Sequence, residues 1–518
     1  MATNFIGVDR DQVFLMPPSV REWVPEDHVV WTILDAVGEL DLSAFYAAYR
    51  ADGHGRPAYE PSMMVALLLY AYARGNRSSR GIERACVEDV AYRVVAGNLV
   101  PDHSTIADFR RRHETALAEL FSGVLGLCAR AGLASVGVVA IDGTKVAANA
   151  SLDANRDYEQ IAREILAEAA ETDRREDELY GEARGDELPE QLRTAEGRRA
   201  ALREAQRKLE RDRAALQAPE SPGGEESESG AGIELDRERF VVRNQGRRGW
   251  TREAQRLLDE RREREARPIA RSRAERLAES KRRLEEAHRV GLEANAAYDA
   301  WRTSGRRSDG RRLGRPPRWN PFTAPERPEG RINTTDHDAR VVRTEGQPPI
   351  QGYNAQAAVN EHQVVVAAEV TVDSPDFGRL EPMVAAAERE LERIGGESPE
   401  VVLADAGYWH TRQLENITAG GIQVLVAPDS GLRKGARPGW SGGLYDFMRR
   451  VLATDHGKAL YRRRKATIEP VFGQIKFNRG IDRFLRRGRA AARSEWRLVT
   501  ATHNLLKFHN HRIAAPTT

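Results

Sequence analysis

The chain has 518 residues, of which 31% are charged, yet its formal net charge at pH 7 is only +2. Two cysteines, Cys86 and Cys128, are too few for a disulfide framework, and their apolar, helix-like surroundings predict reduced core thiols. The first residues lack the basic start and apolar run of a signal peptide, and no stretch approaches the roughly 18 apolar residues of a membrane span. These features exclude a disulfide scaffold and a membrane protein, and predict a soluble, cytoplasmic protein of about two to four domains.

Residues 1 to about 135 are predicted to form a helical N-terminal domain. Pro61–Tyr72 is apolar almost all round, which indicates a core helix. In a later helix, Thr105 and Asp108 have the spacing of a capping box, and Ser104 is an alternative cap. Short helices with a basic helix fit a helix-turn-helix-like DNA-binding domain, but a basic solvated face on ordinary helices explains the pattern equally well. The candidate DNA-binding residues here are Arg110, Arg111 and Arg112.

A predicted strand follows these helices. Val136 to Ile141 are apolar or glycine and rich in β-branched side chains, as in a strand buried on both faces. Asp142 and Gly143 come next, so we expect the strand to stop there and the chain to turn. An acid at the carboxyl end of a buried strand lies at the mouth of a sheet, where open α/β folds carry their chemistry. A lone Asp-Gly pair would be interpreted as a turn, so the companions of Asp142 decide its role.

Residues 156 to 335 have a different composition and are predicted to form a helical insertion. Acidic and basic residues alternate with Ala and Leu, which indicates long exposed helices joined by ion pairs. Pro219–Gly232 is predicted to be disordered, so the insertion resembles a helical arm with a disordered tip. Ser304–Arg331 is predicted to be a basic, irregular linker. Solvated helical surface is the favoured explanation of this charge, and contact with DNA or a dimer partner is the alternative.

Strand patterns return in residues 336–518. Gly352–Val359 and Val364–Val372 are predicted to form a β-hairpin. Together with residues 136–155, this region predicts an α/β domain with a mixed sheet flanked by helices. Its further predicted elements are a helix at Leu380–Ile394 and strands at Val401–Ala404 and Ile422–Ala427.

Two of the predicted strands end in an aspartate, Asp142 and Asp405. If these strands are neighbours in one sheet, the two carboxylates converge at one edge. Glu469, in the helical sequence Tyr461–Lys476, offers a third. Carboxylate oxygens on rigid elements are the ligands that Mg²⁺ prefers, and they leave coordination positions for water and phosphate. Two such ions can activate the attacking oxygen and neutralise the leaving oxygen in phosphodiester chemistry.

On four sequence blocks the chain resembles a bacterial insertion-sequence transposase of the DDE type. Residues 55–112 are also similar to the helical domain that precedes the catalytic core of such enzymes. The resemblance implies a ribonuclease-H-like catalytic domain behind an all-α N-terminal domain, with a long helical insertion. The blocks, in the expected order, are Ile141–Lys145, Gln351–Asn354, Leu403–Tyr408 and Tyr461–Lys476.

The resemblance implies that Asp142, Asp405 and Glu469 are the catalytic metal ligands, for two Mg²⁺ ions that Mn²⁺ can replace. It also implies that Tyr461 and Lys476 flank the site and contact DNA. The family has an arginine four positions before the glutamate, where this chain has Lys465. Its tyrosine lies three positions before that arginine, a spacing that only Arg464 restores. The DNA contacts expected in this block are therefore Lys476, Tyr461, Lys465 and Arg464.

The surroundings of Glu469 leave two questions open. Pro470 follows directly, so a helix either starts near Thr467 or kinks at the proline. Glu469 and Lys476 share a helical face two turns apart, which suits a phosphate passing the site. The alternative for Glu469 is a surface ion pair with Lys465, one turn away.

The region from Tyr461 onward is strongly cationic, with fourteen basic and three acidic residues. A cationic segment beside an acidic metal site fits a DNA backbone. An amphipathic helix is expected to anchor it through Trp496, Leu498, Val499, Leu505, Leu506 and Phe508.

The leading hypothesis is a DNA transposase that binds the terminal inverted repeats of its own insertion sequence. Water activated by the metal would cut each end, and the freed 3′-hydroxyl would attack target DNA. The expected partners are the duplex ends, the target duplex and a second copy of the chain in the DNA complex, with no membrane. Alternatives are a metal nuclease of the same fold without strand transfer, and a DNA-binding regulator. The intact Asp142, Asp405 and Glu469 argue against the regulator.

Overall fold

The computed structural model describes residues 19–49, 58–180, 246–265, 269–270, 272–304, 322–343, 346, 348–373, 375–429 and 441–514. The chain divides into two compact units. The first comprises Met1–Asn155 and Thr335–Thr518, and the second comprises Arg156–Thr334. The segment Pro219–Gly232, for which we predict disorder, lies outside the described residues.

The first unit contains a mixed sheet with the strand order β4-β5-β1-β7-β8, and β6 also pairs with β5. Strand β5 is antiparallel to both β1 and β6, whereas β7 is parallel to both β1 and β8. This arrangement confirms the predicted hairpin and the predicted α/β domain. The strands are β1 (Val138–Ala147), β4 (Arg340–Val342), β5 (Ile350–Asn360), β6 (Val365–Thr371), β7 (Val401–Ala404) and β8 (Gln423–Val426).

Strand β1 does not stop at Asp142, and our prediction of a turn there is wrong. Its pairing with β7 ends at Ile141, opposite Ala404, but its pairing with β5 continues to Ala147, opposite Gly352. Backbone partners on β5 therefore override the local Asp-Gly turn signal. The close approach of the strands requires glycine at position 352, because a Cβ there would collide with the Val146 carbonyl. Asp142 thus lies at the point on β1 where pairing with β7 has ended and pairing with β5 continues.

The N-terminal part of the first unit is helical in its described residues, as predicted. Helix α3 is buried along almost its whole length, which confirms a core helix. The cap of α6 is Asp102, whose Oδ1 accepts the backbone N–H of Thr105 at 2.9 Å, so neither Ser104 nor Thr105 is the cap. The helices are α1 (Val29–Glu39), α2 (Ser43–Tyr46), α3 (Pro61–Ala73), α4 (Ser79–Glu88), α5 (Val90–Val95), α6 (His103–Arg112) and α7 (Glu114–Arg130), after the 3₁₀ turn η1 (Val20–Glu22).

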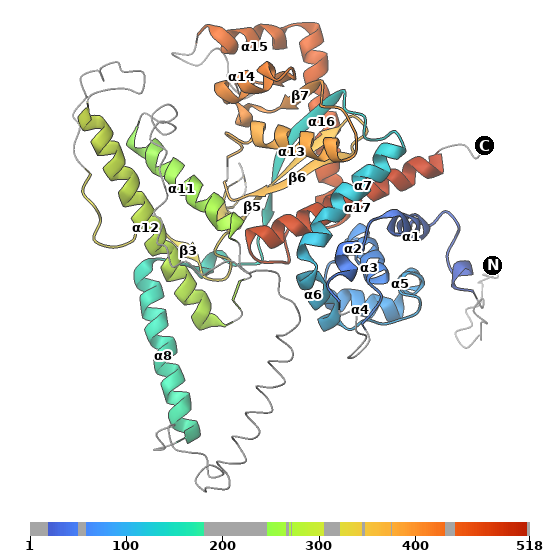
Figure 1. Ribbon diagram of the computed structural model, residues 1–518, viewed down its shortest axis with the longest axis horizontal. Helices are drawn as coiled ribbons and strands as arrows, with labels where there is room; N and C mark the ends of the chain where they lie inside the picture. The colour runs from blue at the N-terminus through green and yellow to red at the C-terminus, as the bar shows by residue number, and fades with distance from the viewer. Residues whose placement is uncertain are drawn as a thin grey trace, which may run out of the picture. The chain divides into compact units, whose positions relative to one another are not determined.

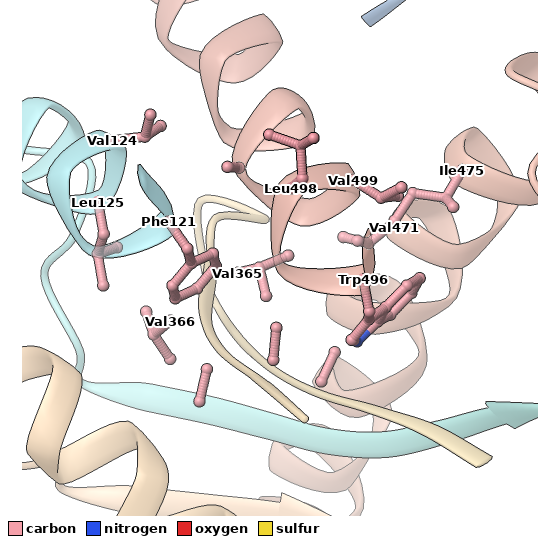
Figure 2. Close-up of a cluster of buried hydrophobic side chains, with 14 of the residues drawn as sticks. Phe121, Val124, Leu125, Val365, Val366, Val471, Ile475, Trp496, Leu498 and Val499 are labelled. Carbon is pink, nitrogen blue, oxygen red and sulfur yellow. The ribbon is translucent and has the colours of Figure 1, made fainter. Parts of the chain in front are cut away.

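These N-terminal helices and the sheet share one hydrophobic core. Figure 2 shows Phe121 of α7, Val365 of β6, Val471 of α16 and Trp496 of α17 in a single buried cluster. Helix α17 packs along α7 (Figure 1). Our prediction of an amphipathic helix is wrong for its central part, because every residue from Ser494 to Leu505 is buried and the helix has no solvent face there. The C-terminal helices are α13 (Leu380–Arg393), α14 (Thr411–Ala419), α15 (Gly443–Ala453), α16 (Asp455–Gly473) and α17 (Arg489–Ala514).

Helix α16 runs through Pro470 and does not begin near Thr467. Proline has no N–H to donate to the carbonyl four residues earlier. That carbonyl, on Ala466, accepts instead from Nε2 of Gln363 at 3.1 Å. The side chain of Gln363, in the β5–β6 hairpin, thus donates the hydrogen bond that the proline cannot. A π-helical segment, η5 (Gln474–Asn478), follows directly.

The second unit consists of helices with exposed ion pairs, which confirms the predicted character of the insertion in its described part. Pairs three or four residues apart recur along the helices, such as Arg175–Glu171 at 2.9 Å. A small core around Trp250 and Tyr298 joins two of the helices. The elements are β2 (Asn155–Arg156), which begins in the first unit, then α8 (Tyr158–Tyr180), α11 (Arg247–Arg264), α12 (Arg273–Ser304) and β3 (Ile332–Asn333), which pairs with β2.

Both cysteines are buried free thiols, as predicted. None of the described helices is both long and apolar enough to cross a bilayer.

Candidate active site

Two aspartates meet at one edge of the sheet, as the sequence predicts for neighbouring strands. Asp142 lies on β1 one residue beyond the pair Ile141–Ala404, and Asp405 directly follows β7. Oδ1 of Asp405 accepts the N–H of Gly407 at 2.8 Å, which caps the turn η4 (Ala406–Tyr408). Burial, and then the charge of Asp405, raise the pKa of Asp142 to about 6. The two carboxylates therefore repel each other in a partly desolvated place.

Both oxygens of Asp142 have partners. Oδ1 accepts the N–H of Gly143 at 2.8 Å, and Oδ2 lies 2.9 Å from Nη1 of Arg464. The Arg464 side chain, on α16, is only 8% exposed. The ring of Tyr461 lies 5.8 Å from this guanidinium, and burial raises the pKa of the Tyr461 hydroxyl. Arg464, which the resemblance suggests as a DNA contact, therefore faces a carboxylate, and Tyr461 flanks that pair.

Glu469 is not part of this cluster. Its side chain is 57% exposed and lies 3.9 Å from the exposed ammonium of Lys465. Five helical residues at about 100° each place Glu469 roughly 140° around α16 from Arg464. The structure thus brings Asp142 and Asp405 together but leaves Glu469 in the surface ion pair that the sequence offered as its alternative. Among the described residues, no three acidic, His or Cys side chains are grouped so that they could hold one metal ion.

Lys476, in η5, lies beside the extension of β1. Its Nζ donates to Oγ1 of Thr144 at 3.1 Å and to the carbonyl of Lys145 at 2.9 Å. Burial lowers the pKa of Lys476. The expected position next to the site is therefore observed, with the ammonium bonded to the strand that carries Asp142.

A further acid, Asp376, lies in the loop between β6 and α13 and was missed from the sequence. Its Oδ1 accepts from the side-chain amides of Asn354 and Gln356, each at 2.7 Å, and lies 3.6 Å from Nζ of Lys145. A Cβ on residue 143 would lie 2.6 Å from Oδ1 of Asp376, so this network requires Gly143. Strand β6 runs parallel to β1, so the rule that located Asp142 and Asp405 also applies to the loop after β6.

The donor chemistry of Asp142 and Asp405 fits a hard divalent cation. Carboxylate oxygens are the appropriate ligands, and a cation would offset the burial and the repulsion by Asp405 that together raise the pKa of Asp142. Arg464 supplies part of that positive charge in the present structure. Asp142 and Asp405 therefore fit the implied metal, whereas Glu469 in its exposed position does not reach it.

Of the three arginines of α6, one is hydrogen-bonded inside the protein and two are exposed. Arg110 donates to the carbonyl of Arg77 at 2.7 Å and also bonds to Ser79. Arg111 is exposed and pairs with Asp108 at 2.9 Å, and the exposed Arg112 lies over the ring of Tyr49. Only Arg111 and Arg112 of the three predicted DNA contacts face solvent.

Much of the C-terminal positive charge is also used inside the protein. Arg479 is buried and donates to Oγ1 of Thr502 at 2.7 Å, and burial lowers its pKa to about 9. The cationic excess predicted from the sequence therefore overstates the charge presented to a ligand. Two other basic residues are largely buried against carboxylate partners, Arg486 with Glu114 and Arg497 with Glu390.

Comparison with protein families gives two matches. Residues 18–112 match the family described as a transposase domain (DUF772), and residues 329–505 match the transposase DDE domain. The second match includes Asp405 and Glu469, and β1 with Asp142 lies between the two matched regions. Neither the curated proteins nor the solved structures contain a significant match. The two matches show that the chain belongs to the DDE-type transposases of insertion sequences.

Proposed function

We propose that the protein binds the terminal inverted repeats of its own insertion sequence, cuts the DNA at the ends and joins them to target DNA by strand transfer. The observation that carries this proposal is the meeting of Asp142 and Asp405, at the point where the pairing of β1 with β7 ends, in a chain of the DDE transposase family. The strand order β6-β5-β1-β7-β8, with β7 and β8 parallel to β1, supports a ribonuclease-H-like catalytic domain. In this proposal residues 136–155 and 336–518 form the catalytic domain.

The proposed metal ligands are Asp142, Asp405 and Glu469, for Mg²⁺ or, in its place, Mn²⁺. A bound divalent cation supplies positive charge at the scissile phosphate and at the attacking and leaving oxygens. Asp142 and Asp405 carry their carboxylates beside each other on neighbouring strands, so both would hold the cation. Glu469 would have to approach from its exposed position on α16, so we assign its role to the DNA-bound protein.

The proposed DNA contacts lie on two surfaces. The first surface surrounds the aspartates, where Tyr461 and Lys476 lie, and includes the exposed Lys465 of α16. These residues would contact the phosphates around the cut. Arg111 and Arg112 would contact the element end, within the helical domain of residues 1–135. Two copies of the chain would act together in the DNA complex, one on each end.

The experiment that tests this function is cleavage of a labelled duplex carrying the element end, with Mg²⁺ and a target duplex. Native protein should cut the end and join it, while Asp142→Asn and Asp405→Asn should bind the duplex without cutting. Asp429→Asn is the matched control, because Asp429 follows strand β8 of the same sheet but bonds to Tyr445 and Arg449. It should retain cleavage.

The outcomes separate the alternatives. Cutting without joining would identify a metal nuclease. Sequence-specific binding without cutting, in Mg²⁺ and in Mn²⁺, would identify a regulator. Equal cleavage by native protein and both aspartate variants would place the site elsewhere.

A further inference from the structure

The contact between Arg464 and Asp142 places a guanidinium where the proposed function needs a metal ion. Nη1 of Arg464 lies 2.9 Å from Oδ2 of Asp142, and Oδ1 is already bonded to the N–H of Gly143. Both side chains are mostly buried, at 8% and 19% exposure. A cation that binds Asp142 in this conformation must compete with the guanidinium for Oδ2.

We propose that Arg464 is a positioning residue that occupies Asp142 in the DNA-free protein and is displaced by the divalent cation, so that the protein alone binds the cation weakly. The inference rests on the proposed function, since it concerns the same pair of aspartates. It differs from the role that the resemblance implies for Arg464, because the partner here is a carboxylate of the protein.

Electrostatics supports an exchange of one positive group for another. Asp142 and Asp405 repel each other, and a buried carboxylate is costly without a positive partner. Arg464 supplies that partner before the cation arrives, with its guanidinium near the ring of Tyr461. Its buried Nε has no hydrogen-bond partner among the described residues. The guanidinium is therefore incompletely satisfied where it lies, which favours its replacement.

Helix α16 carries both Arg464 and Glu469, which links the exchange to the third proposed ligand. Withdrawal of Arg464 and approach of Glu469 would be movements of the same helix. Two features make this helix unusual: the Ala466 carbonyl is held by the Gln363 side chain, and α16 ends in the π-helical segment η5. Short π-helical segments inside or after α-helices frequently occur at functional sites.

The test is a titration of the full chain with Mn²⁺ in the absence of DNA, with the free ion followed by electron paramagnetic resonance. Arg464→Gln should bind Mn²⁺ about ten- to a hundredfold more tightly than native protein, since one charge-assisted hydrogen bond no longer competes. Arg463→Gln is the matched control: it removes the neighbouring charge, which pairs with Glu361 at 2.8 Å on the surface. It should bind as native protein does. Adding Asp405→Asn to Arg464→Gln should abolish the gain.

Arg464→Met, which fills similar space without a charge, should show the same gain and provides a second variant if the glutamine variant does not fold. Thermal unfolding of each variant establishes that it is folded. Unchanged or weaker Mn²⁺ binding in a folded Arg464 variant would overturn the inference while leaving the metal site intact. The same gain in Arg463→Gln would also overturn it, since the effect would then be one of net charge. If Asp405→Asn weakens Mn²⁺ binding neither in native protein nor in any Arg464 variant, both the inference and the proposed metal site fail.

Discussion

The two units of the protein use their charged residues in different ways. In the first unit, buried ion pairs join residues far apart in the sequence, as Arg77 and Glu495 do at 2.7 Å. In the second unit, many pairs lie three or four residues apart on exposed helices, such as Arg289 and Glu293, also at 2.7 Å. Exposed pairs of this kind contribute about 0.3–0.5 kcal/mol, whereas breaking a buried pair costs about 3–5 kcal/mol. Ion pairs of equal length therefore differ severalfold in their effect on stability, and the burial of the pair determines the size of that effect.

The largest expected effect is on chemistry, at the aspartate pair of the first unit. Asp405→Asn keeps the shape of the side chain but removes a negative oxygen ligand, so end cleavage in Mg²⁺ should fall at least about a hundredfold. Binding to the end duplex should persist, because other surfaces provide it. Chelating the metal from native protein should have the same effect on the rate of cleavage. A variant that cuts at the native rate would remove Asp405 from the site.

Glu495→Gln tests the buried pair itself. Glu495 also accepts the backbone N–H groups of Leu485 and Arg486, so the change leaves Arg77 as an uncompensated buried charge. We expect a loss of about 3–5 kcal/mol in the stability of the first unit. Hydrogen exchange of the α3 and α17 amides measures this loss without contribution from the second unit. Glu361→Gln, at an exposed pair, is the control, and a similar loss there would contradict the comparison.

Arg111 and Arg112 extend the comparison to exposed charges of the first unit. Replacing both with alanine should lower affinity for the end duplex about tenfold and reduce the salt slope by roughly one unit for each phosphate that the variant no longer neutralises. Folding should be unaffected. Arg110→Ala should show the reverse, a loss of stability, because Arg110 is bonded inside the helical region. An unchanged salt slope in the double variant would exclude α6 from the DNA interface.

The smallest effect is expected in the second unit. Arg289→Ala removes the exposed pair with Glu293 and should change stability by no more than about 0.5 kcal/mol. Hydrogen exchange within α12 is the measurement. A loss of several kcal/mol would show that surface pairs in this unit are coupled in a network.

The same contrast explains what could be predicted from the sequence. Helix α13 and strands β7 and β8 begin and end within one residue of the prediction because their signals are local: periodicity, and the glycines that follow the helices. Ion pairs on one helix are equally local. Strand β1 extends past Gly143 because β5, far along the chain, supplies its partners. No local pattern contains that information.

The candidate site shows the same division. The strand-end rule pointed to Asp142 and Asp405, although β1 itself continues past Asp142. Applied to the loop after β6, the rule offers two acids, Asp373 and Asp376, and does not decide between them. The direction of Glu469 could not be predicted, because it depends on which face of α16 the sheet buries. The partner of Asp142 could not be predicted either, since Arg464 is 322 residues away in the sequence.

The position of the insertion has a consequence for synthesis. Strand β1 is complete at Ala147, but its partner β5 begins only at Ile350, after the whole second unit. At about 5–20 residues per second, a ribosome needs roughly 10–40 seconds to make the intervening chain. During that time the apolar strand beside Asp142 has no partner, and α7 lacks α17 until later still. Truncated products that lack α17 should therefore expose this surface, and they are expected to be substrates for chaperones and proteases.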